Sequence, residues 1–174
     1  MNESGSFDQV KEQVARAIGQ SCPNTDGVAA KVIAFVASRT YKSVEPGVDL
    51  VESLGDLVRS TTGEAARLGC DLRNVTKGLT VGAFRARDFV RLEAHRVISH
   101  LAGLVVTSTV GARGDLTAAV EGFMDGIAQS ASEMKLNREE AFFEAANAVV
   151  AAAQKAGRTI AVREEGGQFV CEEK

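Results

Sequence analysis

Large aromatic residues and proline are scarce in this chain. It has no tryptophan, one tyrosine and two prolines in 174 residues. Few prolines mean few obligatory helix interruptions, and few aromatic rings leave little surface on which nucleic-acid bases could stack. Alanine and glycine are abundant instead, with 26 and 17 residues, and 45% of the chain is apolar. This composition predicts thin, closely packed helices in one compact domain.

Cysteine is also scarce, and its spacing shows no pairing. Cys22, Cys70 and Cys171 are odd in number and far apart, and no CxxC is present. The sequence therefore predicts neither a disulfide framework nor a zinc site, but three reduced thiols. The first residues contain Glu3 and Asp8 and no apolar run, so we expect no secretory signal and a cytoplasmic protein.

The overall charge and the longest uncharged stretch argue against two further classes of protein. A net charge of -3 argues against a dedicated nucleic-acid-binding protein. The stretch from Val97 to Ala112 has no Asp, Glu, Lys or Arg. It is shorter than the roughly 20 apolar residues that cross a bilayer core. We therefore expect a buried helix there and no transmembrane segment.

Apolar spacing and capping signals predict the helices of the N-terminal half. A capping box predicts a first helix from near Phe7, which should end before Pro23. A second helix should run from Gly27 to about Lys42, followed by a break at residues 43–47. Its candidate caps are Asn24, Thr25 and Asp26.

From Leu50 onward the apolar pattern continues with few interruptions. Residues 49–110 could form one, two or three helices, and a long helix is expected from Leu79 to about Val110. Residues 111–114 should end it. Two more helices should begin after the caps Asp115 and Asn137, the last one closing at Gly157.

These patterns together predict an all-α, single-domain bundle of five or six helices, of which two central ones are long. The bundle should span residues 1–157. Residues 158–174 would form either a small β-hairpin around Gly166 and Gly167 or a disordered tail. A loose echo between residues 76–84 and 117–123 suggests internal repetition, but no period recurs three times, so no solenoid is expected.

The middle of the chain is basic. Residues 57–96 contain eight basic and four acidic side chains. They could form a patch for an acidic protein or an anionic lipid surface, or they could pair with acidic helices within the fold. We favour the second interpretation. The candidate contacts for an anionic partner are Arg73, Lys77, Arg85, Arg87, Arg91 and Arg96.

Small residues at helical spacing suggest a close helix contact. Gly78, Gly82, Ala83 and Ala86 would let another backbone approach. The contact could be a seam between copies of the chain or packing inside the bundle.

The sequence assembles no catalytic or metal-binding motif. His95 and His100 are the only histidines, and no ExxH is present, which excludes a ferritin-like metal centre. No phosphate loop or nucleophile elbow occurs, so no cofactor is predicted.

Three functions remain open. The leading hypothesis is a non-enzymatic interaction or structural protein that forms a homo-oligomer through its Ala/Gly-rich helix faces. The second is an amphipathic coat or lipid-surface protein, which is similar to the phasin type of granule-associated protein in its alanine-rich helices with few aromatics. The third is a small-ligand binder or enzyme with a pocket between helices near His95 and His100.

Overall fold

The computed structural model describes residues 22, 24, 26–33, 50–90 and 93–174. The predicted first helix near Phe7 and the break at residues 43–47 lie outside this part of the chain. A helix at residues 26–33 is followed by α3 (Leu50–Arg67), α4 (Leu72–Val90), α5 (Ala94–Gly111), α6 (Leu116–Glu133) and α7 (Arg138–Lys155). The chain ends with the antiparallel strands β1 (Ile160–Glu165) and β2 (Gln168–Glu173).

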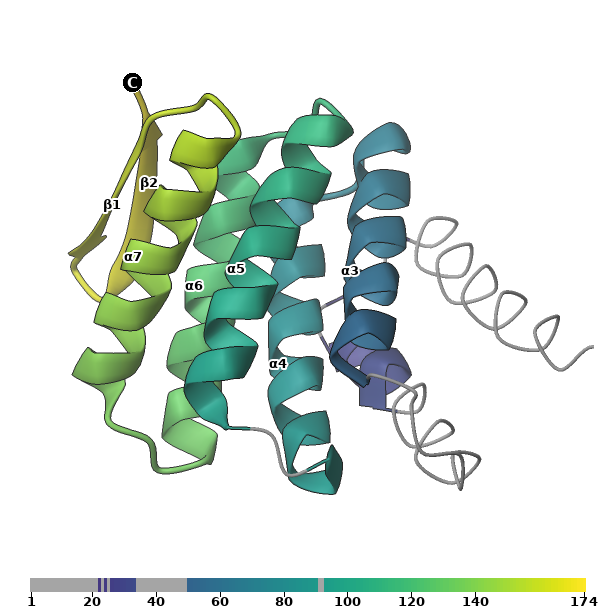
Figure 1. Ribbon diagram of the computed structural model, residues 1–174, viewed down its shortest axis with the longest axis vertical. Coiled ribbons are helices and arrows are strands. Elements are labelled where there is room, and N and C mark those ends of the chain that lie inside the picture. The colour runs from purple at the N-terminus through teal and green to yellow at the C-terminus, as the bar shows by residue number, and fades with distance from the viewer. Residues whose placement is uncertain (1–21, 23, 25, 34–49, 91–92) are drawn as a thin grey trace, which may run out of the picture.

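The helices form two layers (Figure 1). Helices α3, α5 and α7 lie side by side in one layer, and α4 and α6 pack against each other in the other. The helix at residues 26–33 contacts α4, and the β-hairpin covers α6 and α7. The core lies between the layers and contains fully buried side chains such as Leu57, Leu79, Leu101 and Phe123. The predicted all-α bundle is confirmed, and of the two alternatives for the C-terminus the structure has the hairpin.

The elements recur with a constant period. Helices α3, α5 and α7 begin at residues 50, 94 and 138 and end at residues 67, 111 and 155, so each lies 44 residues after its predecessor. The same interval separates the first residues of α4, α6 and β1, which are 72, 116 and 160. Buried apolar side chains stand at this register in four successive units, namely Val28, Leu72, Leu116 and Ile160. The chain is therefore a stack of helical hairpins.

The turns after α3, α5 and α7 repeat with the same period. Gly69, Arg113 and Gly157 have φ angles of 70°, 55° and 74°. In each turn the next residue donates its backbone N–H to the carbonyl oxygen five residues earlier, at 2.9 Å. This arrangement is the Schellman motif, which ends a helix and reverses the chain. Three copies of one turn show that the expectation of no solenoid-like repeat was wrong.

Residues 50–110 form three helices, so the long helix expected from Leu79 to Val110 was wrong. Helix α4 ends at Val90, and Glu93 has the extended backbone (φ -71°, ψ 139°) of a residue that precedes a helix. No glycine or proline lies between Val90 and Ala94. Apolar periodicity alone could not reveal this break, because it continues in phase across it.

Three of the predicted caps are confirmed, whereas the candidate Asp26 is the first residue of the helix at residues 26–33. The Asp115 carboxylate accepts from the N–H of Ala118, and the Asn137 side chain accepts from two N–H groups at the start of α7. Asn24 likewise accepts from the N–H of Gly27, at 2.9 Å. Gly166 and Gly167 both have positive φ angles, which suits a two-residue hairpin turn.

The prediction of three reduced thiols was wrong. Cys22 and Cys70 are joined by a disulfide across 48 residues of sequence, and Cys171 is free and buried. Cys70 lies in the turn between α3 and α4, while Cys22 lies before the helix at residues 26–33. The fold brings these two cysteines together, and sequence spacing alone does not contain that information.

Two non-glycine residues occupy the left-handed position of helix-ending turns, Arg113 and Lys135, with φ angles of 55° and 53°. Because a Cβ atom disfavours this conformation, Arg113→Gly should raise the free energy of unfolding by about 1 kcal/mol. Urea unfolding measured by circular dichroism checks the shift. The matched reverse change, Gly157→Ala, should lower the free energy of unfolding by a similar amount. If both variants shift the free energy of unfolding in the same direction, this explanation is wrong.

Candidate interaction surfaces

The small residues of α4 pack against other parts of the same chain. Gly78, Gly82, Ala83 and Ala86 are all buried. A Cβ atom at Gly82 would lie 2.6 Å from Cβ of Val32, in the helix at residues 26–33. Gly82 therefore packs inside the bundle, as the second interpretation predicts. Because all four residues are buried in the monomer, none of them is available for contact with a second copy.

A second close contact joins α4 and α6. A Cβ atom at Gly126 would lie 2.6 Å from Cβ of Thr80, and one at Gly122 would collide with the backbone oxygen of Arg73. At the same crossing, Thr76 Oγ1 lies 2.7 Å from the carbonyl oxygen of Ala119. The two glycines thus allow two helix backbones to approach closely, with a buried hydroxyl bridging them.

Two of the central arginines are engaged by acidic residues of α6. Arg73 donates from Nε to Asp125 at 2.8 Å and from Nη1 to Glu121 at 2.9 Å. The hydrogen bond to Asp125 is the main cause that raises the pKa of Arg73. Arg85 makes a two-point contact with Glu133, at 3.0 and 2.9 Å, which lowers the pKa of that carboxyl group. These pairs fit the interpretation that the basic helix pairs with an acidic one inside the fold.

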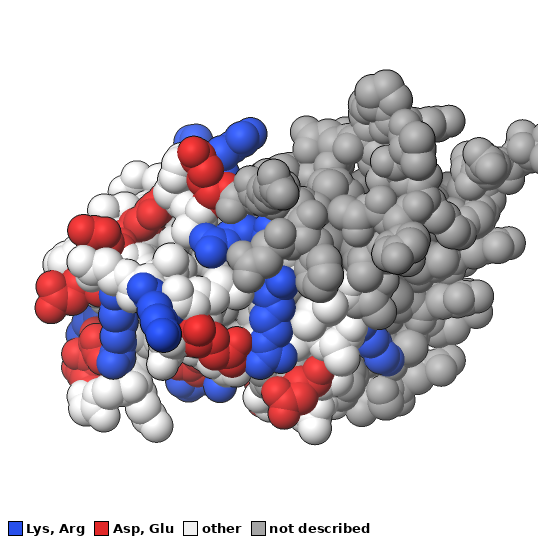
Figure 2. All heavy atoms as spheres, turned by 90° about the horizontal axis from the view of Figure 1, so that it is seen from below, with Lys and Arg blue, Asp and Glu red and all other residues white. Residues whose placement is uncertain are grey.

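The other basic candidates do not converge on one site. Lys77 is half-buried on α4, and the Arg87 guanidinium carbon lies 6.0 Å from the centre of the Phe84 ring. Arg96 is exposed on α5, and Arg91 lies outside the described residues. Figure 2 shows that basic and acidic side chains alternate over the described part of one end of the molecule.

The two histidines occupy different environments. His95 is exposed, and its Nε2 lies 3.5 Å from a carboxylate oxygen of Glu93. His100 is half-buried where α5 meets α3, and a Cβ atom at Gly55 would lie 3.3 Å from its Nε2. No group of three or more His, Cys, Asp or Glu side chains among the described residues could hold a metal ion. The structure therefore does not bring the two histidines together as one site.

One surface was missed by sequence reasoning. Because α4 and α6 cover the inner side of the α3, α5 and α7 layer, the exposed positions of α5 and α7 point outward together. At the start of α5 the exposed positions hold His95 and Arg96, but from Ser99 onward they hold small residues. A Cβ atom at half-buried Gly103 would meet no atom within 4 Å. On α7 the Phe143 side chain is 63% exposed. We call this surface the outer α5–α7 face and define it by Ser99, Gly103, Thr107, Phe143, Asn147 and Ala151.

The 44-residue period is the signal that could have found the outer α5–α7 face. It assigns Phe143 to the register position of Ser99, which is exposed on the neighbouring helix. The helical spacing of Phe142, Ala146, Val149 and Ala153 already predicts that Phe142 faces the core, but it does not show whether another helix covers Phe143. In the structure Phe142 packs on the hairpin and Phe143 faces solvent.

The C-terminal hairpin is fixed by contacts with α6 and α7. The Phe169 ring stacks on Phe142 at 5.4 Å between centroids, and the N–H of Cys171 donates to Glu121 at 3.1 Å. Burial is the main cause that raises the pKa of the Cys171 thiol to about 11. On the exposed side of the hairpin Arg163 pairs with Glu172. The hairpin therefore presents a charged outer surface and an apolar inner one.

Comparison with known proteins provides no functional assignment. No protein-family model matches this chain, and no curated protein is significantly similar to it in sequence. None of the helices in the described ranges is both long and apolar enough to span a membrane.

Proposed function

We propose that the protein is a non-enzymatic helical-repeat protein that self-associates, and that two copies meet through the outer α5–α7 face. The observation that carries this proposal is the exposure of Phe143 beside the part of α5 from Ser99 to Gly111, whose exposed residues are small. Aromatic side chains are enriched at protein–protein contacts. Among the described residues, Leu68 is the other exposed large apolar side chain, at 42%.

The outer α5–α7 face is self-complementary in shape. Phe143 supplies a projecting ring, and Gly103 supplies open space on the adjacent helix. In a two-fold symmetric dimer, each copy offers both partners of every contact, so the ring of one copy can pack over Gly103 of the other. Both contacts form at once, because the symmetry repeats them.

The chemistry of α5 also favours such a contact. Helix α5 has no Asp, Glu, Lys or Arg from Val97 to its end at Gly111, so covering it removes no charge of these residues from water. Burial of an exposed aromatic side chain contributes about 1.5–3 kcal/mol. Two such rings, one from each copy, supply a central apolar contact around which Glu139 and Glu140 of α7 remain at the rim.

The alternative functions receive less support from the contacts. A coat that binds anionic lipid, or an acidic protein partner, would use the central basic residues, but Arg73 and Arg85 are already paired with α6. A ligand pocket near His95 and His100 would need the two side chains to converge. Their separate environments favour the interaction function over the enzyme or ligand-binding function.

Light scattering coupled to size-exclusion chromatography tests the proposal. The full chain should be a dimer, and Phe143→Glu and Gly103→Arg should each weaken dimerisation by at least about tenfold, because each places a charge in the apolar contact. Leu68→Ala is the matched control, since it removes the other exposed large apolar side chain and should leave the dimer intact.

Two outcomes would overturn the proposal. The first is a strict monomer for the full chain at about 100 µM, a concentration that populates even modest dimers. The second is a dimer that Phe143→Glu and Gly103→Arg leave unchanged, because the contact would then lie elsewhere.

A further inference from the structure

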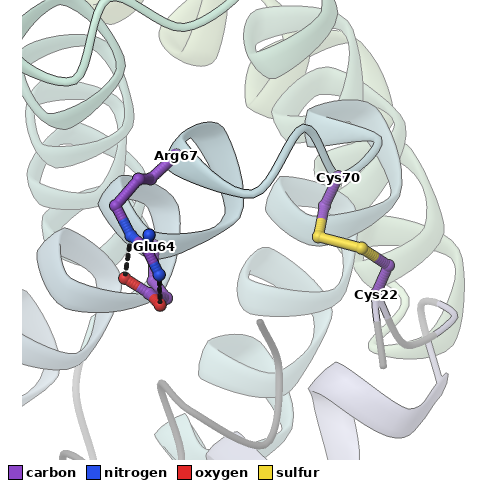
Figure 3. The surroundings of a disulfide bond; sticks show 4 residues. All are labelled: Cys22, Glu64, Arg67 and Cys70. Atoms are coloured by element: carbon purple, nitrogen blue, oxygen red, sulfur yellow. Dashed lines mark hydrogen bonds and ion pairs between the residues drawn. A yellow bond between two sulfur atoms is a disulfide. The ribbon is translucent and has the colours of Figure 1, made fainter. Parts of the chain in front are cut away.

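The Cys22–Cys70 disulfide joins the first described helix to the next helical hairpin (Figure 3). Cys22 is exposed and lies four residues before the helix at residues 26–33. Cys70 is only 8% exposed and lies in the turn between α3 and α4. The bridge therefore ties two units of the stack together at their ends.

The remaining described contacts of this helix form a small apolar patch. Val28, Ala29 and Val32 are fully buried, and the helix lies against the backbone of α4 at Gly82. In a stack of repeats each unit is stabilised by contacts with its neighbours. A covalent link beside the helix at residues 26–33 adds to its local stability, because the link keeps the helix close to α4 whenever the apolar contact opens.

We propose that the Cys22–Cys70 disulfide is a redox-controlled clamp: a dithiol reductant opens it, and the helix at residues 26–33 then detaches from α4 while α6, α7 and the hairpin stay folded. Exposed disulfides are more readily reduced than buried structural ones, and they are the labile or regulatory kind. The arrangement places a bond at exposed Cys22 beside a helix whose described contacts with α4 are apolar.

The exchange reaction balances with a dithiol as the reductant. Its thiolate attacks Sγ of exposed Cys22, the bond to Cys70 breaks, and Cys70 leaves as a thiolate that takes up a proton. The second thiol of the reductant then displaces Cys22 from the mixed disulfide. The protein gains two electrons and two protons as two thiols, and the reductant becomes a disulfide.

Hydrogen exchange read by mass spectrometry tests the clamp. The full chain is compared in its oxidised form and after treatment with dithiothreitol, with native alkylation to report which thiols are open. Alkylation should label Cys22 and Cys70 after reduction and leave buried Cys171 unlabelled. Exchange at residues 26–33 should become at least about tenfold faster on reduction, while exchange in α7 and the hairpin stays unchanged.

Cys22→Ser gives the same comparison without a reductant. It changes an exposed side chain, and it should exchange like the reduced protein whether or not dithiothreitol is present. Unchanged exchange at residues 26–33 after reduction would overturn the proposal. Equal acceleration in α7 and the hairpin would overturn it too, since the bridge would then stabilise the whole fold. If the variant fails to fold, the reduced wild-type chain still decides between these outcomes.

Discussion

Gly122→Ala is expected to lower the free energy of unfolding by about 3 kcal/mol, the upper part of the range for overpacked cores. The added Cβ atom would collide with the carbonyl group of Arg73 and with Thr76 Oγ1 on α4. These are a backbone group and a side chain that is hydrogen-bonded to α6, so neither can move aside independently. The two helices must separate, and separation weakens their whole contact.

Urea unfolding followed by far-ultraviolet circular dichroism measures this effect. Gly63→Ala is the matched control, because it makes the same chemical change in a helix interior where a Cβ atom would meet nothing within 4 Å. It should raise the free energy of unfolding by up to about 1 kcal/mol through higher helix propensity. If both variants are stabilised, the close approach of α4 and α6 at Gly122 is not rigid.

Phe169→Ala should be the most destabilising change in the C-terminal region, by about 3–5 kcal/mol, the usual cost of deleting a buried phenylalanine ring. The Phe169 ring is 4% exposed and stacks on Phe142 of α7. Its loss opens the apolar contact through which β2 covers the bundle. Because the hairpin has only two strands, it depends on this packing to remain folded.

Under native conditions, the backbone amides of residues 160–173 should therefore exchange hydrogen faster in the Phe169→Ala variant than in the wild-type chain. Leu68→Ala provides the control, because it removes an exposed apolar side chain away from the hairpin. The Leu68 side chain is 42% exposed, so the free energy of unfolding should change by no more than about 0.5 kcal/mol. Similar losses for the two variants would show that the hairpin is not anchored by Phe169.

Local signals in the sequence predicted the ends of the C-terminal helices well. Asp115, Asn137 and Gly157 act through hydrogen bonds and backbone angles that involve only a few neighbouring residues. Such interactions form wherever their residues occur, with little dependence on the rest of the fold. The same holds for the hairpin turn at Gly166 and Gly167.

The repeat was only partly visible in the residue identities. Gly78 and Gly82 recur 44 residues later as Gly122 and Gly126, but the left-handed position of the turn is glycine at Gly69 and Gly157 and arginine at Arg113. The buried position three residues after the left-handed residue holds Leu72, Leu116 or Ile160, so there the units share burial and not residue type. The echo that the sequence did show was offset by 41 residues instead of 44, so it did not align the helices.

The candidate surfaces could be predicted only in part, because exposure depends on which helices become neighbours. Pairing of Arg73 and Arg85 with acidic residues follows from the charge imbalance along the chain, although their partners on α6 do not. Gly82 was correctly singled out for a close contact, which the helix at residues 26–33 supplies. The exposure of Phe143 needed the three-dimensional arrangement.

The position of the hairpin has a consequence for the kind of assembly that this chain can build. Strand β1 begins at the register where another helix of the α4 and α6 layer would start, so a two-stranded sheet occupies the place of the next helix. Its outward charges and its different geometry give a following unit no helix to stack upon. At this end of the described structure the stack therefore presents a charged two-stranded sheet in place of a helix, and any unit packed there would have to contact that sheet.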